Sequence, residues 1–159
     1  MEPGRILKTP APVMAAVRYT KAAFMLVFIT LSYWLVGVPE ENYRITKGNA
    51  WCDLRRYGCA IRNYEKALKE KEIPMVRAAV GWCYAQLGMN DSCVAHYRKA
   101  YQRSKSTEIA LGLAFAEHSA GNWDESRQVL KEITAAASTD YERYASDIER
   151  LRQMVDLNA

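Results

Sequence analysis

A chain of 159 residues suffices for one domain with a short appendage, and half of its residues are apolar, as a buried core requires. The net charge of +4 is modest, and no block of Lys and Arg is interleaved with aromatic residues, so the composition argues against a nucleic-acid partner. The two histidines, His96 and His118, have no second ligand at metal-binding spacing. We therefore expect no metal ion and no cofactor.

The first predicted element is a helix whose apolar part covers residues 22–38, a run of 17 residues without a charge; Pro12 could start this helix and Pro39 ends it. At ~1.5 Å per residue the run would extend roughly 25 Å, the short end of what crosses a bilayer core. We predict a transmembrane anchor; the alternatives are a buried core helix and the apolar part of a cleaved signal peptide. Cleavage is disfavoured because the run is followed by Val38-Pro39-Glu40-Glu41 rather than by a small-x-small site.

The charges that flank this run predict its orientation. Basic residues precede it, at Arg5, Lys8, Arg18 and Lys21, whereas the acidic pair Glu40 and Glu41 follows it. By the positive-inside tendency, residues 1–21 are expected in the cytoplasm and the rest of the chain on the far side of the membrane. A bacterial inner membrane facing the periplasm fits this single-pass topology, and a mitochondrial or other organelle membrane is the alternative.

Residues 41–140 contain a repeat with a period of 33 residues. Its three copies cover residues 41–73, 74–106 and 107–139. The best-matched segments are Ala60–Ala67 and Cys93–Ala100, with a weaker third copy at Ser126–Ile133. In each, a small residue, a large residue four places on and an apolar residue three further on lie on one helix face. Such a period predicts stacked helical hairpins and hence an all-α solenoid.

Turn residues separate the two helices of each predicted hairpin. Gly88 and Gly121 supply a residue able to adopt a positive φ after the first helix. Asp91 and Asp124 follow near the start of the second helix, where a carboxylate favours the positive end of the helix dipole. In the first copy Arg55 stands where the glycine is expected, and Gly58 could relocate the turn.

Four cysteines lie within or near the hairpins, at Cys52, Cys59, Cys83 and Cys93. None forms a C-x-x-C pair, which disfavours zinc and thioredoxin-type chemistry. In an oxidising compartment, the pairs Cys52/Cys59 and Cys83/Cys93 could staple antiparallel helices, although three connectivities are compatible with the sequence. The alternative is that the four side chains simply fill core positions.

The pattern resembles the tetratricopeptide repeat (TPR) family over about 100 residues. The family's small residue in the first helix matches Gly48, Gly81 and Ala114, and its large residue three further on matches Trp51 and Tyr84. Its second-helix positions match Ala60, Cys93 and Ser126, then Tyr64, Tyr97 and Leu130, then Ala67, Ala100 and Ile133. Small residues let two helices approach closely, and bulky ones lock each hairpin to its neighbour.

Three features depart from the family pattern. The period is one residue shorter than usual, and the proline expected near each repeat's end occurs only as Pro74. Glu117 replaces the expected aromatic residue in the third copy, where burial of the charge would cost several kcal/mol unless it is paired.

An amphipathic stripe follows the repeats, formed by Tyr141, Tyr144, Ala145, Ile148, Leu151 and Val155. A solenoid exposes its last apolar face unless another element covers it. We therefore predict a capping helix over residues 141–157, with a partner-binding helix as the alternative.

The resemblance also implies a groove lined by the first helix of each repeat. The corresponding positions are Asn42, Ile45, Asn49 and Asp53, then Met75, Ala78, Trp82 and Gln86, then Glu108, Leu111, Phe115 and His118. The hairpin core does not require Trp82 and Phe115 in this register, and aromatic anchors are typical of binding hot spots. The alternative is that the chain itself covers both rings.

The chemistry of these positions bears on the partner. The family's clamp for a C-terminal carboxylate needs several basic and amide residues; Asn49 alone matches, and Glu108 has the opposite sign. A peptide in this groove is therefore expected to be apolar or helical.

Taken together, these features predict a membrane-anchored scaffold or adaptor that binds protein partners, without a small-molecule substrate. The alternative is a chaperone that holds an apolar segment of a secreted or membrane subunit. An enzyme is disfavoured because the nearest acid–base sets, Glu117–His118 and Asp53 beside Cys52, lack a nucleophile–base–orienter arrangement. The sequence also has no glycine-rich loop that could cradle a phosphate.

Overall fold

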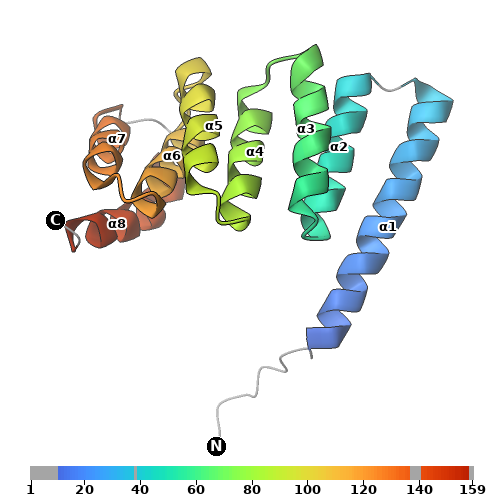
Figure 1. The fold of residues 1–159 in the computed structure, drawn as a ribbon, viewed down its shortest axis with the longest axis horizontal. Helices are drawn as coiled ribbons and strands as arrows, with labels where there is room; N and C mark the ends of the chain where they lie inside the picture. The colour runs from blue at the N-terminus through green and yellow to red at the C-terminus, as the bar shows by residue number, and fades with distance from the viewer. Residues whose placement is uncertain (1–10, 38, 137–140, 158–159) are drawn as a thin grey trace, which may run out of the picture.

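The computed structural model describes residues 11–37, 39–136 and 141–157 and folds them into helices joined by short turns (Figure 1). The helices are α1 (Ala11–Val36), α2 (Glu40–Asp53), α3 (Tyr57–Glu70), α4 (Pro74–Gln86), α5 (Asn90–Arg103), α6 (Thr107–Ser119), α7 (Trp123–Ala136) and α8 (Tyr141–Asp156). Of the predicted segments, residues 1–10, Val38 and residues 137–139 lie outside the described residues.

Helices α2 to α7 form three antiparallel hairpins, α2–α3, α4–α5 and α6–α7, and each hairpin also contacts the next. Figure 1 shows the hairpins side by side in one row, with α8 across the C-terminal end against α6 and α7. The second helices begin at Tyr57, Asn90 and Trp123, so the 33-residue period of the sequence is also the period of the structure. The predicted all-helical hairpin solenoid is confirmed.

The three hairpin turns have the same backbone geometry. In each, an equivalent hydrogen bond closes the first helix: Arg56 N donates to Trp51 O in the first turn, Met89 N to Tyr84 O in the second and Asn122 N to Glu117 O in the third. The residue at the centre of each turn has positive φ, at Gly88, Gly121 and Arg55. The first turn is therefore not relocated to Gly58; Arg55 itself adopts the left-handed conformation at φ 57°, which costs a non-glycine residue roughly 1 kcal/mol.

Contacts between a glycine of one helix and a tyrosine ring of another allow the helices to pack closely, both within a hairpin and between hairpins. The Tyr64 ring of α3 lies on Gly48 of α2, and the Tyr97 ring of α5 lies between Gly81 of α4 and Gly112 of α6. In the third hairpin, the buried Ser126 Oγ donates to the main-chain oxygen of Ala114 at 2.8 Å. A residue with no side chain thus makes room for a ring, which explains the small–large pattern of the repeat.

Gly81→Ala tests this close packing. A Cβ at Gly81 would lie 2.8 Å from Tyr97 Cδ2 and 3.2 Å from the main-chain oxygen of Cys93, and Gly112 confines the ring on its other side. We expect a net loss of about 1–2 kcal/mol in the free energy of unfolding, because overpacking outweighs the gain of about 1 kcal/mol in helix propensity. Urea unfolding followed by circular dichroism measures it.

Gly58→Ala is the matched control, because Gly58 is also helical and a Cβ there would meet nothing within 4 Å. It should be neutral or stabilise by up to about 1 kcal/mol. Equal effects of the two substitutions would contradict the packing argument.

Helix α1 corrects the predicted anchor. Within the part of the chain that the structure describes, no helix combines the length and the apolar character that crossing a bilayer requires. The apolar run within residues 22–38 is short, it begins beside Lys21, and Thr30 and Ser32 interrupt it. The prediction of a single-pass membrane protein, with residues 1–21 cytoplasmic and the repeats on the far side, is therefore wrong.

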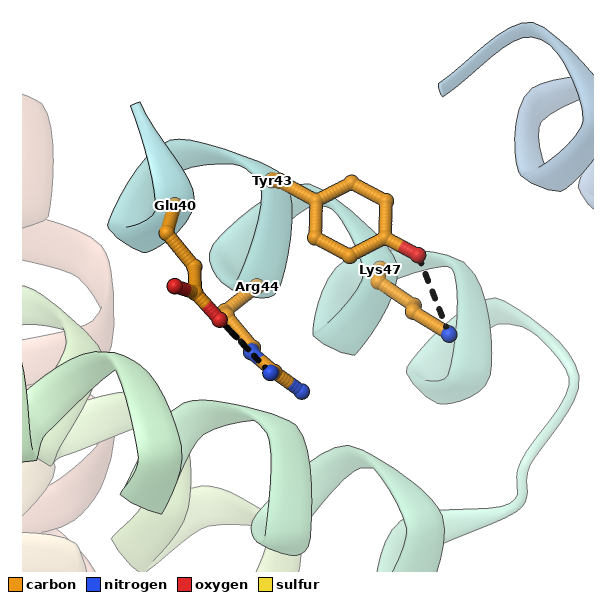
Figure 2. Close-up of polar contacts among 4 residues, drawn as sticks. All are labelled: Glu40, Tyr43, Arg44 and Lys47. Carbon is orange, nitrogen blue, oxygen red and sulfur yellow. Dashed lines mark hydrogen bonds and ion pairs between the residues drawn. The ribbon is translucent and has the colours of Figure 1, made fainter. Parts of the chain in front are cut away.

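Helix α1 instead packs along α2 at the N-terminal edge of the row. The Tyr33 ring of α1 lies 4.7 Å from the Tyr43 ring of α2, centre to centre. Figure 2 shows how the polar face of α2 is fixed: Arg44 Nη2 donates to Glu40 Oε1 at 2.7 Å, and Lys47 Nζ donates to the Tyr43 hydroxyl at 3.2 Å. These contacts join residues four apart on a single helix and stabilise it modestly.

The largest apolar cluster lies at the C-terminal end. It unites α6, α7 and α8 through side chains that include Leu113, Leu130 and Ile133, together with Ile148, Leu151 and Val155. The three α8 residues are fully buried, which shows that α8 covers the apolar surface of the last hairpin.

Candidate partner-binding groove

A hollow of about 230 Å³ lies between the first helices of the second and third hairpins. We call it the α4–α6 hollow; its lining residues are Met75, Ala78, Ala79 and Trp82 of α4, Tyr97 of α5, and Glu108 and Ile109 of α6. The Tyr97 ring reaches it from the second helix layer by passing between Gly81 and Gly112. The same close packing that builds the solenoid therefore also shapes this surface.

Trp82 is the largest side chain that lines the hollow, and 43% of it is exposed. Its ring meets the Tyr57 ring of α3 edge to face, with centres 5.6 Å apart. Met75, about two α-helical turns earlier along α4, is also exposed. A flexible thioether beside a held indole ring gives an apolar surface that can adapt to a partner.

Glu108 is the charged residue among those that line the hollow, and it is exposed. Its Oε2 accepts a hydrogen bond from the Tyr144 hydroxyl of α8 at 3.4 Å. Burial raises the pKa of Tyr97 above its ordinary value, so this phenol stays neutral at physiological pH. The hollow thus offers apolar surface with one carboxylate at its edge.

The predicted groove residues of the first hairpin are arranged differently. Ile45 is half-buried and packs into the apolar cluster between the first two hairpins, whereas Asn42 and Asp53 are exposed. Asn49 is exposed, and its Oδ1 accepts a hydrogen bond from the Tyr64 hydroxyl at 2.6 Å. These residues lie outside the α4–α6 hollow.

The predicted residues of the third hairpin also differ in exposure. Leu111 is buried, at 6% exposed, and Phe115 is half-buried against the cluster that α8 completes. His118 is half-buried near the end of α6, and Gln86 is exposed at the end of α4. Of the predicted groove residues, the hollow brings together Met75, Ala78, Trp82 and Glu108, and it adds Ala79, Tyr97 and Ile109, which the first-helix positions did not include.

A second hollow of about 310 Å³ lies between α1 and α2. Its lining residues are Met25, Phe28, Ile29 and Ser32 of α1 and Tyr43 and Thr46 of α2. Helix α1 also exposes large apolar side chains, at Phe24, Val27, Phe28, Leu31, Trp34 and Leu35. The polar residues among its lining are Ser32, Tyr43 and Thr46.

The four cysteines are free thiols in the structure. The possible hairpin staples Cys52/Cys59 and Cys83/Cys93 are therefore not formed in the structure, and Cys83 and Cys93 lie buried in the core. Among the described residues, no group of three or more His, Cys, Asp or Glu side chains is placed to hold a metal ion.

Comparison with known proteins places the fold. No family model and no curated protein sequence matches the chain. Solved structures do match: a tetratricopeptide repeat protein from Parabacteroides merdae has a TM-score of 0.66 and 18% identity, over 95% of this chain and 65% of that one. The Sgt2 TPR domain from Aspergillus fumigatus has a TM-score of 0.61 and 18% identity, over 75% and 83% of the two chains. Yeast Tom70 has a TM-score of 0.59 and 21% identity.

The fold is thus that of the tetratricopeptide repeat solenoids, as the sequence pattern predicted. The match to Tom70 covers 74% of this chain but only 25% of the Tom70 chain, so the similarity concerns the repeat fold and not that protein as a whole.

Proposed function

We propose that this chain is a non-catalytic scaffold or adaptor that binds a protein partner in the α4–α6 hollow. The observation that carries the proposal is the half-exposed Trp82, held edge to face by Tyr57 at the wall of a hollow between two first helices. A pre-positioned indole loses little conformational entropy on binding, which is why such rings dominate binding energies. The fold supports the proposal because its hairpins present a continuous surface to a ligand.

The proposed partner segment is apolar or helical. The lining of the hollow is apolar except for Glu108 and the Tyr97 phenol, and a carboxylate at the edge repels the free end of a polypeptide. A partner helix could place its apolar face on the apolar lining and a Lys or Arg of its own near Glu108. The proposal therefore excludes recognition of a C-terminal carboxylate.

A chaperone that holds an apolar segment of another subunit is the second candidate, favoured by the adaptable thioether of Met75 at the hollow. Co-purification distinguishes the two. A stable complex of fixed stoichiometry supports the scaffold, and transient capture of many unfolded clients supports the chaperone.

The partner segment is to be found by photocrosslinking from residue 75, an exposed lining position that leaves Trp82 in place, in native cells, with the crosslinked peptide identified by mass spectrometry. Synthetic copies of that peptide, with a C-terminal acid or a C-terminal amide, should bind with equal affinity. A preference of tenfold or more for the acid would contradict the proposed mode of recognition.

Trp82→Ala should weaken binding of that peptide by roughly 30-fold, the effect of losing about 2 kcal/mol at an aromatic hot spot. Isothermal titration measures the affinity, and circular dichroism checks that the fold is retained. The matched control is Trp123→Ala, because Trp123 is 44% exposed but lies on α7, away from the hollow. It should change the affinity less than twofold; an equal loss in both variants would reject the groove.

A further inference from the structure

Two cysteines meet between the first two hairpins, in a pairing that the sequence left open among three connectivities. The Sγ atoms of Cys52 in α2 and Cys83 in α4 lie 3.3 Å apart, although 31 residues separate them in the chain. They belong to the apolar cluster that joins these hairpins. Cys59 and Cys93 contribute no thiol to this contact.

The two thiols differ in access and in acidity. Cys83 is fully buried, whereas Cys52 is half-buried and so accessible to a small reagent. The hydrogen bond from Cys83 is the main reason that the pKa of Cys52 is lowered to about 7, although burial and Asp53 act in the opposite direction. The Tyr64 hydroxyl oxygen also lies close, 3.5 Å from Cys52 Sγ. The same hydrogen bond and burial raise the pKa of Cys83.

We propose that Cys52 and Cys83 form an oxidisable dithiol, a modification site at which a low-molecular-weight disulfide generates a covalent bond between the first and second hairpins. The sulfur atoms are already in contact at 3.3 Å, and a disulfide would bring them to roughly 2.05 Å.

The chemistry divides between the two residues. The Cys52 thiolate attacks one sulfur of the disulfide RS–SR, which forms a Cys52–SR mixed disulfide and releases RS⁻. Cys83 then loses its proton and attacks Cys52 Sγ, which forms the Cys52–Cys83 bond and expels the second RS⁻. The two protons from the cysteines yield two RSH, so the protein loses two electrons and the external disulfide gains them.

The bond would fasten the first helix of one repeat to the first helix of the next. Helix α4 also carries Trp82, next to Cys83 in the chain, so oxidation restrains the helix that forms one wall of the α4–α6 hollow. The modification stands independently of what that hollow binds, because it rests on the thiols alone.

The test uses the full chain, purified reduced and equilibrated with mixtures of oxidised and reduced glutathione. After the free thiols are blocked with N-ethylmaleimide, we expect the intact mass to show two unblocked cysteines without glutathione, and a peptide map to link Cys52 to Cys83. The thermal midpoint should rise by roughly 5–15 °C and return with dithiothreitol. A link between Cys52 and Cys59 or between Cys83 and Cys93, or glutathione adducts with no internal link, would overturn the proposal.

Two variants sharpen the result. Cys59→Ser/Cys93→Ser retains the pair and should form the same link at the same glutathione ratio; failure to do so overturns the assignment. Cys83→Ser removes the second attacker and should accumulate a stable glutathione adduct at Cys52, whereas adduct formation at Cys59 in its place would show that Cys52 is not the entry point. Both variants can be tested without knowledge of the protein partner.

Discussion

Leu151→Ala is expected to lower the free energy of unfolding by about 2–5 kcal/mol, one of the two largest effects that we predict for this protein. Leu151 is fully buried where α8 meets α6 and α7, and truncation would leave a cavity lined by Leu130, Ile133 and other cluster residues. Chemical unfolding followed by circular dichroism measures the loss. The affected cluster is the largest in the described chain, so the whole C-terminal end should loosen.

The matched control is Leu157→Ala, because Leu157 follows the same helix but is 85% exposed. It should change stability by less than about 0.5 kcal/mol. If Leu151→Ala were equally mild, α8 would not be the cover of the last hairpin, and a partner-binding role for this helix would become the better interpretation.

Arg98→Ala is expected to cost about 2–4 kcal/mol, because it removes the cation that balances a buried carboxylate. Glu117 of α6 is only 2% exposed; its Oε1 accepts from Arg98 Nε at 2.6 Å and its Oε2 from Asn122 Nδ2 at 2.8 Å. The hydrogen bond to Glu117 raises the pKa of Arg98. We place the cost below that of a fully buried pair, because the Arg98 side chain is half-exposed and water can partly replace it.

Two further variants isolate the charge. Arg44→Ala removes an ion pair of similar length, 2.7 Å to Glu40 (Figure 2), but both partners are accessible to solvent, and it should cost less than about 1 kcal/mol. Arg98→Ala/Glu117→Gln should recover much of the loss of Arg98→Ala, since a neutral amide does not need a cation. No recovery would mean that packing of the arginine stem, and not the buried charge, explains the cost.

The hairpin core was predictable because its rules are local. Gly48 and Tyr64 in the first copy and Gly81 and Tyr97 in the second lie 16 residues apart, with the turn that reverses the chain between them. The tyrosine ring fits only where the facing helix has a small residue. The residue types therefore predict both which helices pair and the period of the repeat. The turns follow in the same way from Gly88 and Gly121.

The interpretation of α1 failed because apolar composition does not specify what an apolar helix packs against. An apolar run such as residues 22–38 can lie in a membrane or pack against other helices of the protein. The flanking charges predict only which end of a membrane helix faces the cytoplasm, and not whether the helix crosses a membrane. In the structure the helix packs along α2 through Tyr33 and Tyr43, a contact between segments whose sequences show no mutual pattern.

The candidate groove was predictable only in part. Met75 and Trp82 follow from the repeat register, because their positions on α4 face away from the hairpin core. The burial of Leu111 could not be foreseen in the same way, since it depends on α8, which lies outside the repeat and covers the last hairpin at an angle that no period encodes.

The sequence by itself therefore determined the helices, their pairing into three hairpins and the helix faces that each hairpin buries, because these depend on contacts at a fixed spacing along one chain segment. Only the tertiary structure decided which first-helix residues stay exposed, which cation pairs with Glu117 and which thiol meets Cys52. Those contacts join different repeats or the helices at the two ends, and their geometry is set by how whole hairpins stack.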